Sequence, residues 1–212
     1  MHWLESIEVR WFFSPEHPVV EELRQWFGHV EIEHDDRCDH YYFDQRRPDL
    51  NAKDRTGGSD PAKLEFKYRV GTLGPTHFAP GVVGDLERWT KLSLAIGDDT
   101  IAAFPLSVAV RKARRLRKFE YSHAQLAEIP IDKKIGAGCG AEFTTIEASR
   151  HAQVESAVTF GLEAYGPPEV ALGALQSTAR LLFQERPALE LGAANSGCYS
   201  SWLIKRFPSG AR

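Results

Sequence analysis

The chain has 212 residues, of which 42% are hydrophobic and 26% charged, and its formal net charge is −3 at pH 7. This composition is typical of a globular protein and excludes long disorder, and the negative charge argues against binding of polyanions through the overall field. The three cysteines are widely spaced without a C-x-x-C pair, which argues against a structural zinc site and a disulfide framework.

No apolar run approaches the ~20 residues that a transmembrane helix needs. The first residues have neither the basic nor the apolar region of a signal peptide. We therefore expect a cytoplasmic protein without membrane contact, folded as a single domain over residues 1–212.

The first elements are a strand and a helix. Apolar and polar side chains alternate over residues 7–13, as in a strand with one buried face. A helix is predicted over residues 15–27, with Ser14 as its cap and Pro15 in its first turn.

Further alternation predicts strands over residues 64–70 and 158–165, and weaker signals predict strands over 38–44, 50–55, 86–94, 107–118 and 140–147. Glycine and proline clusters predict loops over 54–61 and 71–84, and an Ala- and Leu-rich stretch predicts a helix over 168–184. About eight strands are the usual number for a small closed barrel. The expected fold is α+β: an antiparallel eight-stranded β-barrel, or tunnel, with a few flanking helices.

Charged residues recur at spacing two on several of these strands, for example Glu65, Lys67 and Arg69. In an ordinary small barrel this face would meet water, and the apolar face would fill the interior. If the charged faces instead point inward, they line a wet tunnel, and an anionic ligand and a cation are needed to pair with its charged side chains. Helices and long loops would then cover the apolar outer faces.

The stretch from Arg111 to Lys118 holds six basic residues. By strand parity, Lys112 and Arg114 lie on one face, while Arg115 and Arg117 lie on the other. Val108 has the same parity as Lys112, so an apolar and a charged side chain fall on one face of the strand. Either the strand bulges between them, or one end of the barrel interior is apolar. A nucleic-acid surface would require more interleaved aromatic residues, so RNA or DNA is not the expected partner, and an RNA-binding barrel stays open only as a third alternative.

Taken in order, the charged strands resemble the triphosphate tunnel metalloenzyme superfamily, which includes CYTH-type phosphatases and cyclases. The family's opening Glu-x-Glu-x-Lys strand is similar to residues 6–10, although Ser6 replaces the first Glu and Arg10 the Lys. The later segments that carry the resemblance are 37–42 (Arg-x-Asp-x-x-Tyr), 53–55 (Lys-x-Arg), 65–69 (Glu-x-Lys-x-Arg), 87–91 (ending in Trp-x-Lys), 110–114 (containing Lys-x-Arg), 140–144, 160–164 and the closing Ser-Tyr segment 196–203.

This resemblance implies a metal-dependent phosphohydrolase acting on inorganic triphosphate or a triphosphorylated organic substrate. The implied phosphate-binding residues are Arg10, Lys53, Arg55, Lys67, Arg69, Lys91, Lys112 and Arg114. The implied Mg²⁺ or Mn²⁺ ligands are Glu8, Glu142 and Glu163, with Glu8 and Glu163 catalytic.

The first-strand Glu pair holds catalytic metal in the family, so Ser6 puts hydrolysis in question more than fold or phosphate binding. The sequence therefore leaves open a non-catalytic polyphosphate- or nucleotide-binding protein on the same fold, and also a cyclase. The expected partner is a triphosphate or nucleotide-like small molecule, and a homodimer is compatible with the sequence. Most Trp residues and Tyr199 are interpreted as packing residues, whereas Trp89, on the face of Lys91, is placed to touch an organic part of a ligand.

Overall fold

The computed structural model describes residues 2–30, 32–33, 38–56, 63–95 and 107–208. Its elements in chain order are β1 (His2–Phe13), α1 (Pro18–Trp26), β2 (Ile32–Glu33), β3 (Cys38–Tyr42), β4 (Leu50–Thr56), β5 (Lys63–Ala79), β6 (Val82–Ala95), β7 (Val108–Ser122), β8 (Gln125–Ile129), β9 (Gly138–Arg150), β10 (Gln153–Tyr165), α2 (Pro168–Glu185), the 3₁₀ turn η2 (Ala193–Asn195) and α3 (Tyr199–Arg206).

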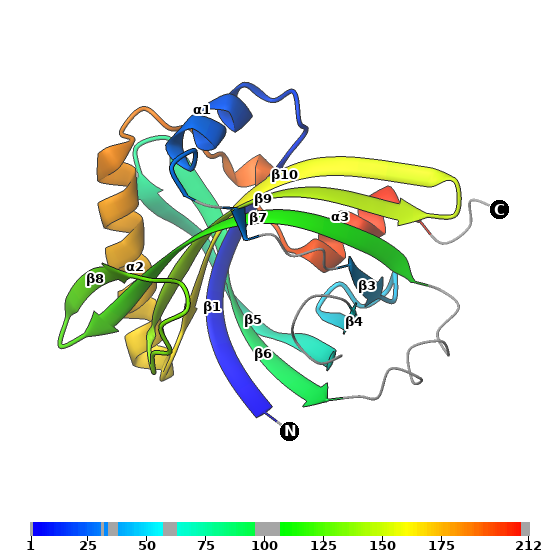
Figure 1. Cartoon of the computed structure of the whole chain (residues 1–212), viewed down its shortest axis with the longest axis horizontal. Helices are drawn as coiled ribbons and strands as arrows, with labels where there is room; N and C mark the ends of the chain where they lie inside the picture. The colour runs from blue at the N-terminus through cyan, green and yellow to red at the C-terminus, as the bar shows by residue number, and fades with distance from the viewer. Residues whose placement is uncertain (1, 31, 34–37, 57–62, 96–106, 209–212) are drawn as a thin grey trace.

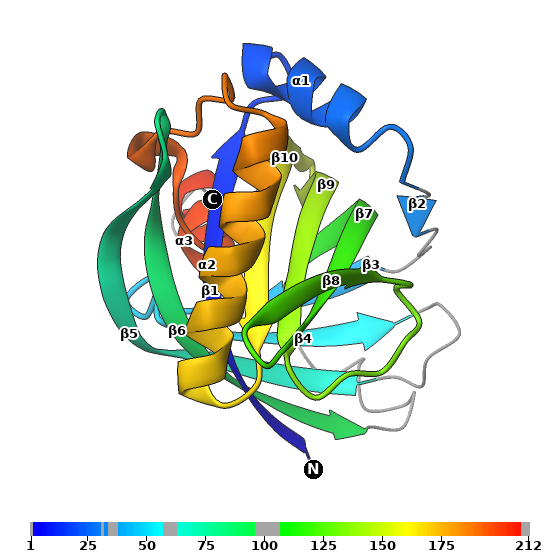
Figure 2. The ribbon, with the colours of Figure 1, turned by 90° about the vertical axis from the view of Figure 1, so that its left-hand side faces the viewer.

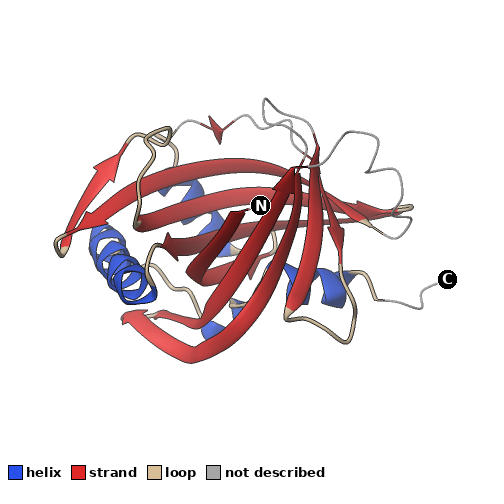
Figure 3. Cartoon of the chain, turned by 90° about the horizontal axis from the view of Figure 1, so that it is seen from below, coloured by secondary structure: helices blue, strands red, loops and turns tan. Residues whose placement is uncertain are grey.

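Within the described residues, eight antiparallel strands form a closed ring in the order β7, β3, β4, β5, β6, β1, β10, β9, since β9 pairs with β7 again. Strands β2 and β8 pair with β7 beside the ring. The strands curve around a common interior, and the helices lie against the ring (Figure 1, Figure 3). The predicted α+β fold, an antiparallel eight-stranded tunnel with a few helices, is confirmed.

The largest apolar core lies outside the ring rather than inside it. On β1 the side chains of Val9 and Trp11 are buried in one cluster with Phe160 of β10 and Leu175 and Leu182 of α2. Helix α2 packs along β10, β9 and β1 (Figure 2). Because successive side chains of a strand point to opposite faces, burial of this apolar face under α2 turns the charged face of β1 into the interior.

The apolar outer face of β5 is a different case. Phe66 is 38% exposed, Tyr68 46% and Val70 54%. Val70 borders a small pocket with Pro168 and Ala171 of α2. The side chains of Phe66, Tyr68 and Val70 nevertheless stay exposed, so the expectation that helices and loops cover all outer faces is wrong for these residues of β5.

One end of the interior is apolar and filled. Val108 and Val110 of β7 are buried with Trp202 and Leu203 of α3, and the pairing of β7 with β9 runs without a register shift. The sequence left two explanations for Val108 lying on the same strand face as Lys112. The apolar end of the barrel is correct, and the bulge in the strand is wrong. Helix α3, which was not expected from the sequence, closes this end.

Several predicted boundaries differ from the structure, and most strands are longer than predicted; β1, for example, begins at His2 and β10 at Gln153. Helix α1 begins at Pro18 rather than Pro15, because Ser14 accepts a turn hydrogen bond from His17 N at 3.0 Å, and His17 Nδ1 then caps the helix. The predicted loop over 71–84 is a long hairpin of β5 and β6, whose register shifts at three places absorb the irregular residues. The predicted loop over 54–61 is strand as far as Thr56, and the rest of it lies outside the described residues.

No helix in the described part of the chain has the length and apolar character needed to cross a membrane.

Candidate anion site in the tunnel

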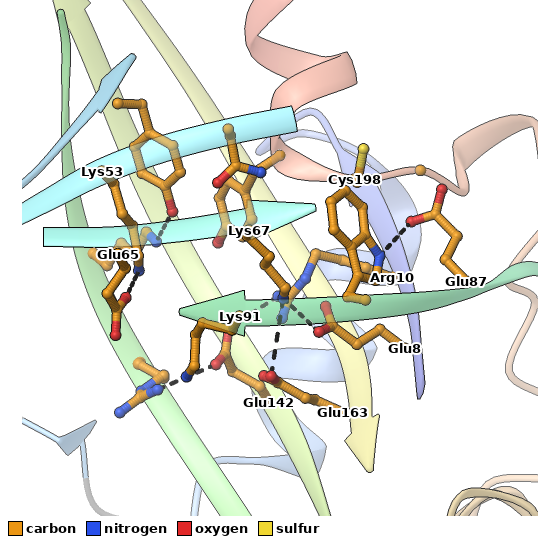
Figure 4. A pocket seen from close by; sticks show the side chains of 17 residues that line it. Glu8, Arg10, Lys53, Glu65, Lys67, Glu87, Lys91, Glu142, Glu163 and Cys198 are labelled. Carbon is orange, nitrogen blue, oxygen red and sulfur yellow. Dashed lines mark hydrogen bonds and ion pairs between the residues drawn. The ribbon is translucent and has the colours of Figure 1, made fainter. Parts of the chain in front are cut away.

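A cavity of about 250 Å³ lies inside the ring. Basic and acidic side chains from seven strands line it, and Figure 4 shows them converging on the cavity. Its described lining residues are Glu8, Arg10, Tyr41, Asn51, Lys53, Glu65, Lys67, Glu87, Trp89, Lys91, Lys112, Arg114, Glu142, Glu163, Gly197, Cys198 and Tyr199. Six of these side chains are basic and five are acidic, so the described lining is close to electrically neutral.

The first cluster joins Lys67 to two glutamates. Lys67 Nζ donates to Glu8 Oε1 and lies 3.9 Å from Glu163 Oε1, as Figure 4 shows. Ser6 Oγ donates to Glu8 Oε1 at 2.6 Å. Ser6 therefore supports the carboxylate of Glu8 with a hydrogen bond.

The electrostatics of the two glutamates differ. Burial, followed by the neighbouring Glu163 carboxylate, raises the pKa of Glu8 above its usual value, although Lys67 and Ser6 oppose the shift. Burial also acts to raise the pKa of Glu163, but the ammonium groups of Lys67 and Lys91 outweigh it and lower that pKa to about 2. Glu163 is therefore fully ionised at neutral pH.

A second cluster forms around Glu142 on β9. Arg10 Nη1 donates to Glu142 Oε1 at 2.9 Å, and Arg114 Nη1 lies 3.4 Å from Oε2. Thr144 Oγ1 donates to the same carboxylate at 2.8 Å. Burial opposes the charge of Glu142, but Arg10 and Arg114 dominate and hold its pKa well below the usual range.

The third cluster forms around Asp39 on β3, whose side chain is fully buried. Its Oδ2 accepts from Lys53 at 3.1 Å and from Lys112 at 3.0 Å, and Lys53 also pairs with Glu65 at 3.1 Å. Lys112 Nζ donates in addition to the hydroxyl of Tyr41 at 2.7 Å. Asp39 thus holds two lysines at the wall of the cavity without lining it.

Lys91 on β6 is the exception among the six basic side chains. Within the described residues it has no ion pair or hydrogen bond to a carboxylate, while the other five lining cations each have a carboxylate partner. An incoming anion can therefore contact Lys91 without first displacing a carboxylate.

Most of the residues predicted for this site meet in the cavity. All three glutamates, Glu8, Glu142 and Glu163, line it, as do six of the eight predicted phosphate-binding residues. Arg69 does not line it: its guanidinium pairs with Glu87 and lies 5.8 Å from the ring centroid of Trp89. The backbone of Arg55 belongs to β4, but its side chain lies outside the described part.

The carboxylates do not form a preformed metal site. Among the described residues, no three side chains of His, Cys, Asp or Glu lie close enough together to hold a metal ion. The oxygens of Glu8 face the ammonium of Lys67, and those of Glu142 face Arg10 and Arg114. Basic side chains of the chain itself occupy the positions facing the oxygens of Glu8 and Glu142, so a Mg²⁺ or Mn²⁺ ion would have to displace them to reach the predicted ligands.

Sequence analysis assigned several residues of the wall no role in the site. Glu65 and Glu87 share the parity of Lys67 and Lys91 on their strands, a signal that could have placed them in the cavity. Trp89 lies on the predicted face, with its Nε1 donating to Glu87 Oε2 at 3.0 Å. No strand periodicity could have found Tyr199, because it opens helix α3.

No protein-family model and no curated protein sequence matches the chain. Among solved structures it is similar to a chain of the Schizosaccharomyces pombe Mediator head module, with a TM-score of 0.46 and 9% identity over 88% of this chain and 96% of that one. It is also similar to a Hippeastrum protein described as a putative adenylyl cyclase, HpAC1, with a dominant triphosphatase activity (TM-score 0.42, 11% identity, 95% of each chain). A third similarity is to the S. pombe RNA triphosphatase Pct1 (TM-score 0.39, 12% identity, 88% and 79% of the chains).

Proposed function

We propose that the protein binds a compact polyphosphate-type anion inside the tunnel, either inorganic triphosphate or the triphosphate group of a nucleotide-like molecule. The observation that supports this most directly is the convergence of six basic side chains from five strands on one cavity. Arginines offer forked donors to phosphate oxygens, and lysines offer point charges. The cavity volume lies just below the ~300–1,000 Å³ of pockets for drug-sized ligands, which suits a compact ligand.

The proposed binding residues are Arg10, Lys53, Lys67, Lys91, Lys112 and Arg114. Lys91 is the first contact because it has no carboxylate partner in the described part of the chain. The other cations must exchange carboxylate oxygens for phosphate oxygens, so part of the binding free energy is spent on breaking ion pairs. Binding should consequently weaken as salt concentration rises.

The test is calorimetry and thermal unfolding with inorganic triphosphate, first in EDTA and then with Mg²⁺ or Mn²⁺. At about 100 times its dissociation constant, a ligand adds ~2.7 kcal/mol to the unfolding free energy, which raises the melting temperature of a chain this size by a few degrees. Sulfate at equal ionic strength is the control. No shift with triphosphate in any of these buffers would contradict the proposal.

Metal-dependent hydrolysis of the bound triphosphate is a second candidate, with Glu8 and Glu163 catalytic. It is favoured by one observation: two glutamates share a single cation, Lys67, at the wall of the same cavity. Hard divalent cations prefer carboxylate oxygens, so Mg²⁺ or Mn²⁺ would have to displace Lys67. Phosphate release that needs the metal and is lost in Glu163→Gln, with the melting temperature unchanged, would support hydrolysis; release unaffected by Glu163→Gln would refute this assignment.

A further inference from the structure

Two tyrosines lie side by side in the cavity wall next to the end closed by α3. Tyr41 comes from β3 and Tyr199 is the first residue of α3, and both line the cavity. Their rings are stacked, with centroids 5.8 Å apart and an angle of 20° between the planes. Phe12 meets the Tyr199 ring edge-on at 5.4 Å, so the packing fixes the ring without help from its hydroxyl.

The hydroxyls of both rings have a hydrogen-bonding capacity that the described residues do not use. The Tyr199 hydroxyl is buried and has no partner among them. The Tyr41 hydroxyl accepts from Lys112 Nζ at 2.7 Å, but an ammonium can only donate, so the phenolic proton of Tyr41 is still available. Within the described part of the chain this proton has no acceptor. A buried hydroxyl without a partner costs stability, which indicates a role other than packing.

Two cations lie over the ring of Tyr199. Lys112 Nζ lies 4.3 Å from the centroid of this ring, and the guanidinium carbon of Arg10 lies 5.1 Å from it. Both cations are paired with a carboxylate, Lys112 with Asp39 and Arg10 with Glu142, that an anion would have to displace. A phenolic O–H is a neutral donor, so it attracts an anionic oxygen without bringing a carboxylate counter-ion of its own.

We propose that Tyr41 and Tyr199 form a phenol pair that binds a terminal phosphoryl group of the tunnel's ligand, together with Lys112. This inference rests on the proposed function. A terminal phosphoryl group carries three strong acceptor oxygens, so it can accept from both phenols and from Lys112 at once. The phenol pair therefore fixes which end of the ligand lies beside α3, and Tyr199 is a ligand-binding residue rather than a packing residue.

The decisive variant is Tyr199→Phe, which keeps the ring stack and removes only the hydroxyl. Calorimetry with inorganic triphosphate should show binding weakened about tenfold or more, the usual effect of losing a hydrogen bond to a charged group. The melting temperature of the ligand-free variant should equal or exceed that of the wild type, because an unpartnered buried hydroxyl has been removed. Tyr41→Phe should also weaken binding, but it removes an acceptor from Lys112 as well.

The matched control is Tyr121→Phe, because Tyr121 on β7 packs against the core beneath α2, outside the ring. It should leave triphosphate affinity unchanged. Equal affinity of Tyr199→Phe and wild type would overturn the phenol pair and leave the proposed function intact. If ligand-free Tyr199→Phe melts several degrees below the wild type, the Tyr199 hydroxyl is structural, and this result also overturns the phenol pair. A wild type that binds no triphosphate would overturn the proposed function and, with it, this inference.

Discussion

Lys67 on β5 and Glu8 on β1 form an ion pair across the interior, although β6 lies between their strands in the ring. Because the same ammonium lies 3.9 Å from Glu163 on β10, one lysine links strands that do not pair directly. The charged interior therefore contributes to the closure of the ring as well as to its binding chemistry.

Replacing Lys67 by Met should lower stability more than replacing Lys91 by Met. The first variant leaves Glu8 and Glu163 without their shared cation, at a cost on the order of 3 kcal/mol. Lys91 has no ion pair in the described part, but its ammonium helps to lower the pKa of Glu163. Its loss should therefore cost less stability than the loss of Lys67, and it should weaken triphosphate binding. Chemical unfolding and calorimetry of the two variants separate these effects, and an equal loss of stability in both would contradict the pairing.

Acid should destabilise the protein through Glu142 and Glu163. Both have folded-state pKa values below their unfolded values, so their contribution is present at neutral pH and is lost as pH falls from about 4.5 toward 2. Glu142→Gln should therefore have a lower unfolding free energy than the wild type at pH 7. At pH 3 the difference in unfolding free energy between the two proteins should be smaller.

The charge of Glu8 has the opposite effect on stability, because the folded-state pKa of Glu8 is raised. Its charge costs stability at neutral pH, and that cost disappears as pH falls through the folded-state pKa. Glu8→Gln should consequently be much less destabilising at pH 7 than Glu142→Gln. Urea unfolding of both variants across this pH range makes the comparison, and an equal loss in both at pH 7 would contradict the assignment.

Mg²⁺ or Mn²⁺ alone should not raise the melting temperature of the ligand-free protein, because basic side chains already pair with Glu8 and Glu142. EDTA-treated protein is the reference, and Ca²⁺ controls for unspecific effects of divalent charge. A rise of several degrees with Mn²⁺ but not Ca²⁺ would show that the carboxylates do form a metal site.

Gly161→Ala should weaken triphosphate binding through Arg10. A β-carbon at Gly161 would lie 3.0 Å from the guanidinium carbon of Arg10, so the guanidinium would have to shift by a few tenths of an ångström, which strains its hydrogen bonds to Glu142 and Thr159. Gly192→Ala is the control, since nothing lies within 4 Å of its β-carbon. Calorimetry of both variants checks this, and equal affinity in the two would contradict a role for the position of Arg10 in binding.

Arg117→Met should lower stability by about 1–2 kcal/mol and leave triphosphate affinity unchanged. Arg117 faces outward, where it donates to Glu128 at 2.8 Å and to Glu185 of α2 at 2.8 Å. The effect is modest because these glutamates are 46% and 37% exposed and water screens the pairs. Altered affinity at unchanged stability would contradict this structural role.

Much of the site is readable from strand periodicity. Glu65 and Lys67 must share a face because side chains alternate along a strand, and the same rule separates Lys112 from Arg117. The sequence thus determined which charged side chains lie together on each strand. It also indicated α2, because an Ala- and Leu-rich segment of that length favours a helix.

Alternation cannot decide which face of a strand is inside, because an apolar face is satisfied by any apolar surface that covers it. Only the packing of α2 against Val9 and Trp11 outside the ring decides that the charged face points inward. In the same way, only the docking of α3 brings Tyr199 onto Tyr41. The balance of the interior, with lysines and arginines paired to buried carboxylates from other strands, depends on contacts between distant segments, and no local pattern encodes them.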